Sequence, residues 1–440
     1  MGTEQRLYVG VGKYQVMLDD ACLPIDNFVE VRDPLYARVL LLENRMEGHS
    51  KRYGILSLDV TNMYAGGIDI FREILEEYAG VNMADAWITV THNFTTPHIW
   101  QVPKEGESDV PRPSHAIRTE EEIARSRNTN KAFFTAAIQA SAMAAEHMQP
   151  ALCGADDGLC HVNASRNMRT REGWWLGCDA EEFSDHTVSV LKFETPEGEP
   201  IALLYTYDCQ SSVMGKSVRA DGTKRMTSDL LGLASTYVER EYGENFVALA
   251  LCGAAGDQEP QLKANRTEVD RNGEMRTIDL ADEGFVLLDT QAARLGAEVL
   301  KTSERIICGD AFVRGTHAHF TCGTKQMERN LKKLHPTTSH TYVPDGEREV
   351  DIYLLEIGEF VLVGTQAELA SRTAAEIRAV SPYAHTAVAT LVNGAAKYMM
   401  NAEAYDVFMY GALNSIFARG SAERFAGESG KALMSLWETK

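Results

Sequence analysis

Residues 87–98 read WITVTHNFTTPH, an apolar run of four residues that passes directly into a polar turn with two histidines. Short apolar runs rich in β-branched and aromatic residues are typical of buried strands. Ligand sites in α/β folds gather where such strands end. The segment therefore predicts a strand over 87–90 and a candidate site at His92 and His98, with a purely structural role for each histidine as the alternative.

The alternation of strand and helix patterns continues on both sides of this segment. Other strand-like apolar runs lie at 38–42, 55–60, 187–193, 201–207, 246–251, 352–355 and 360–363. Helical patterns lie at 68–78, 131–148, 229–242, 287–302, 370–380 and 402–417. The polar segments at 103–113 and 263–275 are typical of surface loops. This order predicts an α/β fold with mixed β-sheets flanked by helices, in one domain over residues 1–440.

The chain of 440 residues carries 63 acidic and 43 basic side chains, which give a formal net charge of -20. Such a field repels nucleic acid and anionic membrane surfaces. No run approaches the ~20 apolar residues of a membrane span. We therefore expect a small-molecule substrate and neither a nucleic-acid nor a membrane partner, while a homo-oligomer stays open.

The first residues, MGTEQRLYVGVGKYQV, lack the cationic start and the apolar stretch of a signal peptide. The eight cysteines are scattered along the chain, and no two of them form a CxxC pair. Both features are expected of a protein in a reducing compartment. The sequence therefore predicts a cytoplasmic location with all thiols reduced.

Carboxylates follow two further predicted strands. The run CGAAGDQEP at 252–260 places Asp257 and Glu259 beside glycines, which let a backbone approach a ligand closely. A tight turn with solvated acids is the alternative. Glu368 follows the strand predicted at 360–363 and precedes a helix, where it could instead interact with the helix dipole.

The remaining candidates are tyrosines and a histidine pair. Tyr398 and Tyr410 are twelve residues apart, and each taken singly is also explained by packing in a core. His317 and His319 are spaced to place both rings on one face of a strand, where they could bind a metal or simply form a polar face.

The order of these segments resembles the catalytic N-terminal domain of neutral (non-lysosomal) ceramidases. The matching segments are VGVGKY at 9–14, LYAR at 35–38, SLD at 57–59, TH at 91–92, 163–166, 188–193, SD at 228–229, GD at 256–257, Glu368, Tyr398 and Tyr410. The resemblance covers nearly all of residues 7–420. It implies the fold of that domain, and we expect the family's C-terminal immunoglobulin-like domain to be absent.

The resemblance also implies one divalent metal, with zinc expected. Of the family's zinc ligands, the first histidine, the glutamate and the tyrosine fall on His92, Glu368 and Tyr398. The second zinc histidine falls on Gln210, and the catalytic serine falls on Glu259. A neutral amide is a weak zinc ligand, so these departures predict that long-chain ceramide is not the substrate.

Other side chains could compensate for these departures. His98, Asp208 or Cys209 could replace the missing ligand. Glu259 could serve as a ligand or as the base that activates water. In the family order Arg166 faces the site, where it could hold an anionic or carbonyl oxygen.

We therefore expect a metal-dependent hydrolase that cleaves an amide-like C–N bond in a small polar metabolite. The catalytic residues would be Glu259, Asp257 and Tyr410, and the substrate-binding residues Arg166, His98 and Gln210. One alternative is a lyase or isomerase that uses Glu259 as a base on a sugar-like or hydroxy-acid substrate. The other is a non-catalytic binding protein on a decayed hydrolase scaffold.

Overall fold

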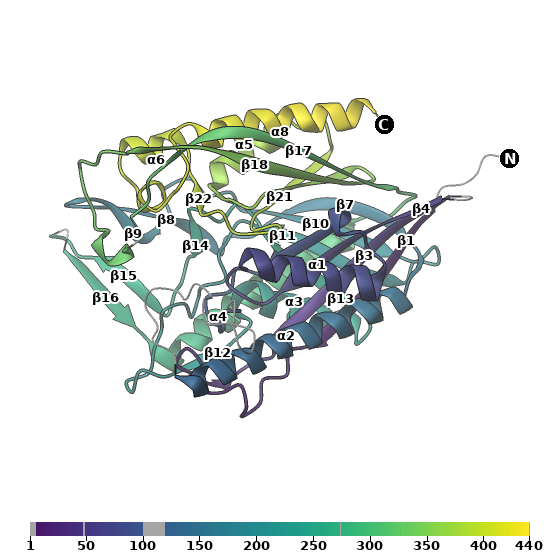
Figure 1. Cartoon of the computed structure of the whole chain (residues 1–440), viewed down its shortest axis with the longest axis horizontal. Helices are drawn as coiled ribbons and strands as arrows, with labels where there is room; N and C mark the ends of the chain where they lie inside the picture. The colour runs from purple at the N-terminus through teal and green to yellow at the C-terminus, as the bar shows by residue number, and fades with distance from the viewer. Residues whose placement is uncertain (1–5, 47–48, 100–118, 273, 329, 440) are drawn as a thin grey trace.

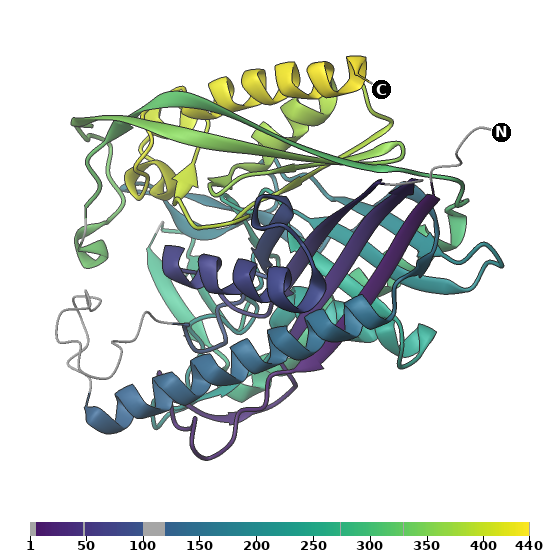
Figure 2. The same cartoon turned by 45° about the vertical axis from the view of Figure 1, so that its right-hand side comes forward.

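Three β-sheets surround one shared apolar core, and helices cover their outer faces. The structure is a computed structural model that describes residues 6–46, 49–99, 119–272, 274–328 and 330–439. The shared core takes side chains from all three sheets, including Leu42, Leu204 and Leu362. Figures 1 and 2 show helix α8 (Ser421–Glu438) and helix α2 (Glu120–Glu146) at opposite edges of the molecule.

The first sheet has the strand order β5-β4-β3-β1-β6. Its strands are β1 (Arg6–Gln15), β3 (Tyr36–Met46), β4 (His49–Leu58), β5 (Ala86–Val90) and β6 (Gln149–Pro150). Leu40 and Leu42 point into the shared core, whereas Val39 and Leu41 pack against helices α1 (Ala65–Ala79) and α2. This alternation follows from the two-residue period of a strand.

The second sheet has the order β13-β11-β10-β7. Its strands are β7 (Leu152–Leu159), β10 (Thr187–Glu194), β11 (Pro200–Tyr207) and β13 (Val247–Cys252). Helices α3 (Asp229–Tyr242) and α4 (Phe285–Arg305) pack on its outer face through buried residues such as Leu231 and Leu295.

The third sheet has the order β17-β18-β19-β21. Its strands are β17 (Val313–Lys325), β18 (Pro344–Ile357), β19 (Phe360–Gly364) and β21 (His385–Ala389). Helices α5 (Ser371–Val380) and α8 cover it. Each large sheet contains one parallel pair, namely β4 with β5, β11 with β13, and β19 with β21, and is otherwise antiparallel.

Smaller elements connect the ends of these strands. One three-stranded sheet has the order β14-β8-β9, with β8 (Asn163–Thr170), β9 (Gly173–Asp179) and β14 (Gln258–Pro260). The two-stranded sheets are β2 (Phe28–Val31) with β12 (Lys224–Met226), β15 (Asn265–Val269) with β16 (Met275–Asp279), and β20 (Glu368–Leu369) with β22 (Tyr398–Met399). The short helices are α6 (Ala402–Asp406) and α7 (Tyr410–Leu413).

The predicted mixed α/β class is confirmed, but several predicted elements differ. The loop predicted at 263–275 is wrong, because β15 and β16 form a hairpin there. The single helix predicted at 402–417 is also wrong, because Phe408 has a φ of 58° and separates α6 from α7. The loop predicted at 103–113 lies outside the described residues. No helix in the described ranges is long and apolar enough to cross a membrane.

Candidate functional site

His92 lies two residues after β5, in the turn that the sequence singles out. Its φ of 51° is left-handed, and its side chain is buried. Nδ1 lies 2.7 Å from the carbonyl oxygen of Thr61, so Nδ1 carries a hydrogen, because a carbonyl only accepts. Nε2 lies 3.1 Å from Oε2 of Glu368. The two side chains can therefore hold one proton between them.

Glu368 is brought to His92 by the short parallel pair of β20 and β22. In this pair Glu368 stands opposite Tyr398, and its N–H donates to the carbonyl oxygen of Lys397 at 3.0 Å. Burial acts to raise the pKa of the Glu368 carboxyl. The interactions with His92, Arg166 and Lys397 outweigh burial, and the pKa is lowered. Glu368 is therefore held as a carboxylate.

Arg166, on β8, completes the group around Tyr398. Its guanidinium carbon lies 4.5 Å from the ring centre of Tyr398 and 5.6 Å from that of Tyr410. Burial acts to lower the pKa of Arg166, but Tyr398, Glu368 and Tyr410 outweigh it and the pKa is raised. Burial also raises the pKa of Tyr398, which Arg166 only partly opposes. The site thus combines a charged guanidinium with a neutral phenol.

Tyr410 is the first residue of α7 and borders the same group. Its ring lies 6.2 Å from the ring of Tyr398 and makes an edge contact of 5.4 Å with Trp175 of β9. The side-chain amide of Asn414 donates to its hydroxyl oxygen at 3.1 Å. Tyr410 is thereby held in place by strand β9 and by the residue that ends its own helix.

A backbone contact joins Asp257 to this group, and Gln210 contacts the same turn. Gln210 follows β11, and its side-chain amide nitrogen donates to the carbonyl oxygen of Ala255 at 3.2 Å. Asp257 follows β13, and its carbonyl oxygen accepts the N–H of Arg166 at 2.8 Å. Its carboxylate accepts the N–H of Ser371 at 2.9 Å, and burial raises its pKa. Both residues thus stand at the carboxyl ends of parallel strands.

Glu259 and His98 have other partners. Oε2 of Glu259 lies 2.7 Å from the amine of Lys263, and both line a pocket of about 380 Å³. His92, Glu368 and Tyr398 are not among the described residues that line this pocket. The backbone N–H of His98 donates to the carboxylate of Asp26 at 3.3 Å. The structure therefore groups together His92, Glu368, Tyr398, Arg166 and Tyr410. Glu259 instead forms an ion pair with Lys263.

The other residues proposed to replace the missing ligand have contacts of their own. Asp208 accepts the N–H of Ala254 at 2.8 Å and the hydroxyl of Ser371 at 3.2 Å. Cys209 is buried. His317 and His319 each pair with a carboxylate on β18, and both rings are exposed.

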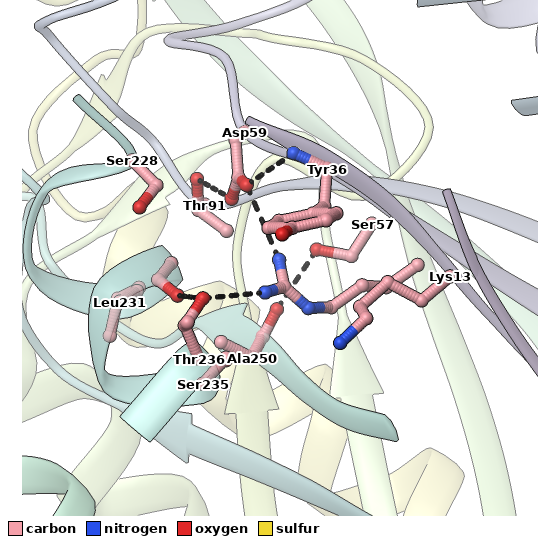
Figure 3. A network of polar contacts seen from close by, with 12 residues as sticks. Lys13, Tyr36, Ser57, Asp59, Thr91, Ser228, Leu231, Ser235, Thr236 and Ala250 are labelled. Carbon is pink, nitrogen blue, oxygen red and sulfur yellow. Dashed lines mark hydrogen bonds and ion pairs between the residues drawn. The ribbon is translucent and has the colours of Figure 1, made fainter. Parts of the chain in front are cut away.

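A network of buried ion pairs lies next to His92, and the sequence analysis did not predict it. Figure 3 shows Asp59 at the end of β4, between Tyr36 and Thr91. Its carboxylate accepts from the Thr91 hydroxyl at 3.2 Å, and Thr91 directly precedes His92. The other oxygen accepts from Arg38 at 3.2 Å, and Arg38 in turn donates to Glu239 of α3 at 2.8 Å. The sequence signal was the single arginine inside the apolar run ARVLLL.

These residues do not by themselves fit a zinc ion. His92 and Glu368 are typical ligands, and the Nδ1 contact of His92 is common in metal-bound histidines. A zinc site needs at least three strong ligands, whereas Tyr398 is a neutral phenol beside a guanidinium and Gln210 is an amide. In the part of the chain that the structure describes, no three His, Cys, Asp or Glu side chains are grouped to hold a metal. Zinc binding stays a prediction, which metal analysis of the purified protein tests.

Comparisons of the chain with known proteins find similarity in structure alone. No protein-family model matches the sequence, and no curated protein matches it. Neutral ceramidase from Pseudomonas aeruginosa matches with a TM-score of 0.69 and 14% identity, over 99% of this chain and 75% of that chain. A ceramidase complexed with C2 matches with the same TM-score and identity, over 99% and 76%. The chain therefore has the mixed α/β fold of neutral ceramidase.

Proposed function

We propose that this protein is a hydrolase that cleaves an amide-like C–N bond in a small polar metabolite. The observation that supports it is the contact between His92 and Glu368, beside buried Arg166 and Tyr398. The fold shared with neutral ceramidase supports the reaction class by analogy. A pocket of about 70 Å³ lies next to Asp257, whose carbonyl oxygen accepts the N–H of Arg166. Its described lining includes the polar side chains of Ser165, Asn167 and Asn401 but not those of His92, Glu368 or Tyr398.

The proposed reaction begins with water. Because Nδ1 of His92 donates to Thr61, the lone pair of Nε2 faces the Glu368 carboxylate when the imidazole is neutral. Nε2 takes a proton from the attacking water and shares it with the Glu368 carboxylate, while the hydroxide oxygen bonds to the carbonyl carbon. The same proton then passes to the nitrogen as the C–N bond breaks. The products are a carboxylic acid and an amine.

Tyr398 is assigned to the developing negative charge on the carbonyl oxygen. Its phenol keeps its hydrogen, because burial raises its pKa, and so it can donate to an oxyanion. The Arg166 guanidinium over its ring adds positive charge nearby. Glu259, the base predicted from the sequence, is assigned no proton transfer, because its carboxylate is paired with Lys263.

The test is a screen of small N-acyl compounds, with detection of the released amine. In water labelled with oxygen-18, hydrolysis places the label in the carboxylate product, whereas a lyase or isomerase places none there. Glu368→Gln should lower kcat by about 10²–10⁴-fold, as expected for loss of a proton-transfer group. Exposed Glu359→Gln is the matched control and should retain activity.

Two further assays test the finer parts of the proposal. Release of fatty acid from long-chain ceramide would show that the substrate is not restricted to small polar compounds. Metal analysis of protein purified without chelator tests the zinc prediction directly. Full activity of Glu368→Gln, or products without label, would refute hydrolysis by the His92–Glu368 pair.

A further inference from the structure

Arg166 is a buried cation without a carboxylate of its own. Its side chain is 5% exposed, and its Nη2 has no hydrogen-bond partner among the described residues. Glu368, whose charge acts on the pKa of Arg166, is already in contact with His92. Buried charges are normally paired and hydrogen-bonded. Arg166 therefore leaves one donor free at the site.

A second free cation, Lys216, lies close to the same site. Lys216 follows a tight turn in which the N–H of Gly215 donates to the carbonyl oxygen of Ser212 at 3.1 Å. The φ of Lys216 is 65°. A Cβ on Gly215 would lie 3.4 Å from Cβ of Phe94. Phe94 and Lys216 line one small pocket, and the Phe94 ring lies 4.7 Å from the His92 ring. Lys216 therefore stands at the edge of the His92 site.

The charges around Lys216 leave a positive excess. Lys216 forms no ion pair with any residue in the described ranges. Burial lowers its pKa, and the positive charges of Lys263 and Arg166 add to this, while Glu259 opposes them. Glu259 is itself paired with Lys263. In a chain with a net charge of -20, Arg166 and Lys216 thus carry positive charge without an ion pair among the described residues.

We infer that the substrate carries an anionic oxygen group, a carboxylate or a phosphate, which Arg166 and Lys216 bind together. This inference rests on the proposed function in taking the His92 site as the substrate site. Arg166 offers a planar donor group that suits two oxygens of such an anion. Lys216 would add a second positive charge at the edge of the site. Tyr398 stays free to donate to the reacting carbonyl oxygen.

The test measures anion binding without turnover. Calorimetric titration of the whole protein with inorganic phosphate, with acetate and with neutral acetamide, at constant ionic strength, should give binding of at least one anion and none of acetamide. The stronger of the two anions identifies the group. Lys216→Gln should weaken binding about fivefold, and Arg166→Lys about tenfold or more, because lysine lacks the fork geometry.

Lys301→Gln is the matched control, because Lys301 is an exposed lysine on α4 and is paired with Glu298. This variant should bind the anion as the wild type does. Equal binding by wild type, Lys216→Gln and Arg166→Lys, or no preference for anions over acetamide, would overturn the inference. Anion binding without C–N cleavage of any compound would refute the proposed function alone. Cleavage of neutral N-acyl compounds as fast as anionic ones would refute the inference alone.

Discussion

Asp208 lies buried between the end of β11 and the start of α5, next to the candidate site. Burial raises the pKa of its carboxyl to about 7, and Asp185 adds to this effect, while Arg378 opposes it. The carboxyl also accepts hydrogen bonds from Ala254 and Ser371. These contacts are not enough to compensate for removal from water. A single side chain therefore couples the stability of this region to pH.

We predict that Asp208→Asn stabilises the protein more as the pH rises. In the wild type the folded state keeps the proton up to about pH 7, whereas the unfolded chain releases it near the ordinary value of 3.8. The contribution of Asp208 is therefore fully present below about pH 4 and is lost as the pH rises to about 7. The difference in unfolding free energy between variant and wild type should grow by up to roughly 1.4 kcal/mol per pH unit in this range.

Urea unfolding at several pH values between 4 and 8 measures this difference. Exposed Asp310→Asn is the control and should show a flat difference. A difference for Asp208→Asn that shrinks with rising pH would contradict the prediction.

Sequence reasoning reached some residues of the site and missed others for physical reasons. His92 and Glu368 were named because each follows a predicted strand, and Tyr398 was named through the family resemblance. The structure places the three side by side. Arg38 and Glu239 were missed because 201 positions separate these two partners. A buried charge in an apolar run signals an unknown partner, and sequence alone does not say which one.

At the scale of elements, strand β1 and helix α2 pack backbone against backbone. A Cβ on Gly12 would overlap the carbonyl oxygen of Ala140 and lie 2.8 Å from the nitrogen of Ala144. A Cβ on Gly10 would overlap the carbonyl oxygen of Ala144. Because these neighbours are backbone atoms, they cannot rotate away. The motif VGVGKY therefore has a packing role that is separate from the candidate site.

We predict that Gly12→Ala lowers the free energy of unfolding by about 1–3 kcal/mol or more, as overpacking does in well-packed cores. Gly427→Ala, in the interior of α8, is the matched control, because nothing lies within 4 Å of its added methyl group. The control should be stabilised by about 0.5–1 kcal/mol, since alanine favours the helix. Denaturant unfolding of both variants decides the matter, and equal effects would contradict the close approach of α2 to β1.

Element boundaries were harder to predict than element types. Helix α2 begins at Glu120, eleven positions before the predicted start, behind a capping box formed by Thr119 and Glu122. Its first turns are polar and lacked the apolar period used for prediction. Helix α8 was missed because Gly427 and Gly430 interrupt its pattern. In both cases tertiary packing stabilises a helix whose local sequence gives a weak signal.

At the scale of the whole molecule, the alternation of strands and helices was enough to predict the mixed α/β class. It was not enough to predict how the sheets meet. Strands β11 and β13 pair in parallel although helix α3 separates them, and β19 pairs with β21 across α5. The shared core is assembled from Leu7 to Val392. Only long-range packing brings these segments together, and no local pattern encodes it.

This shared core leads to a prediction about cooperativity, namely that residues 1–440 unfold as one unit. Leu362 of β19 is fully buried and contacts a core that also contains Leu204 and Leu251 of the second sheet. Leu362→Ala should therefore lower the free energy of unfolding by about 2–5 kcal/mol. The loss should reach all three sheets, because their inner faces share this core.

The reactivity of two free, buried cysteines measures this coupling. Cys252 lies on β13 of the second sheet, and Cys322 lies on β17 of the third. In a urea series both thiols should become reactive at the same midpoint in the wild type, and Leu362→Ala should shift both midpoints by the same amount. Val380→Ala, at an exposed position at the end of α5, should shift neither. If Leu362→Ala exposes Cys322 early and leaves Cys252 protected, the third sheet unfolds separately, and the chain consists of two cooperative units.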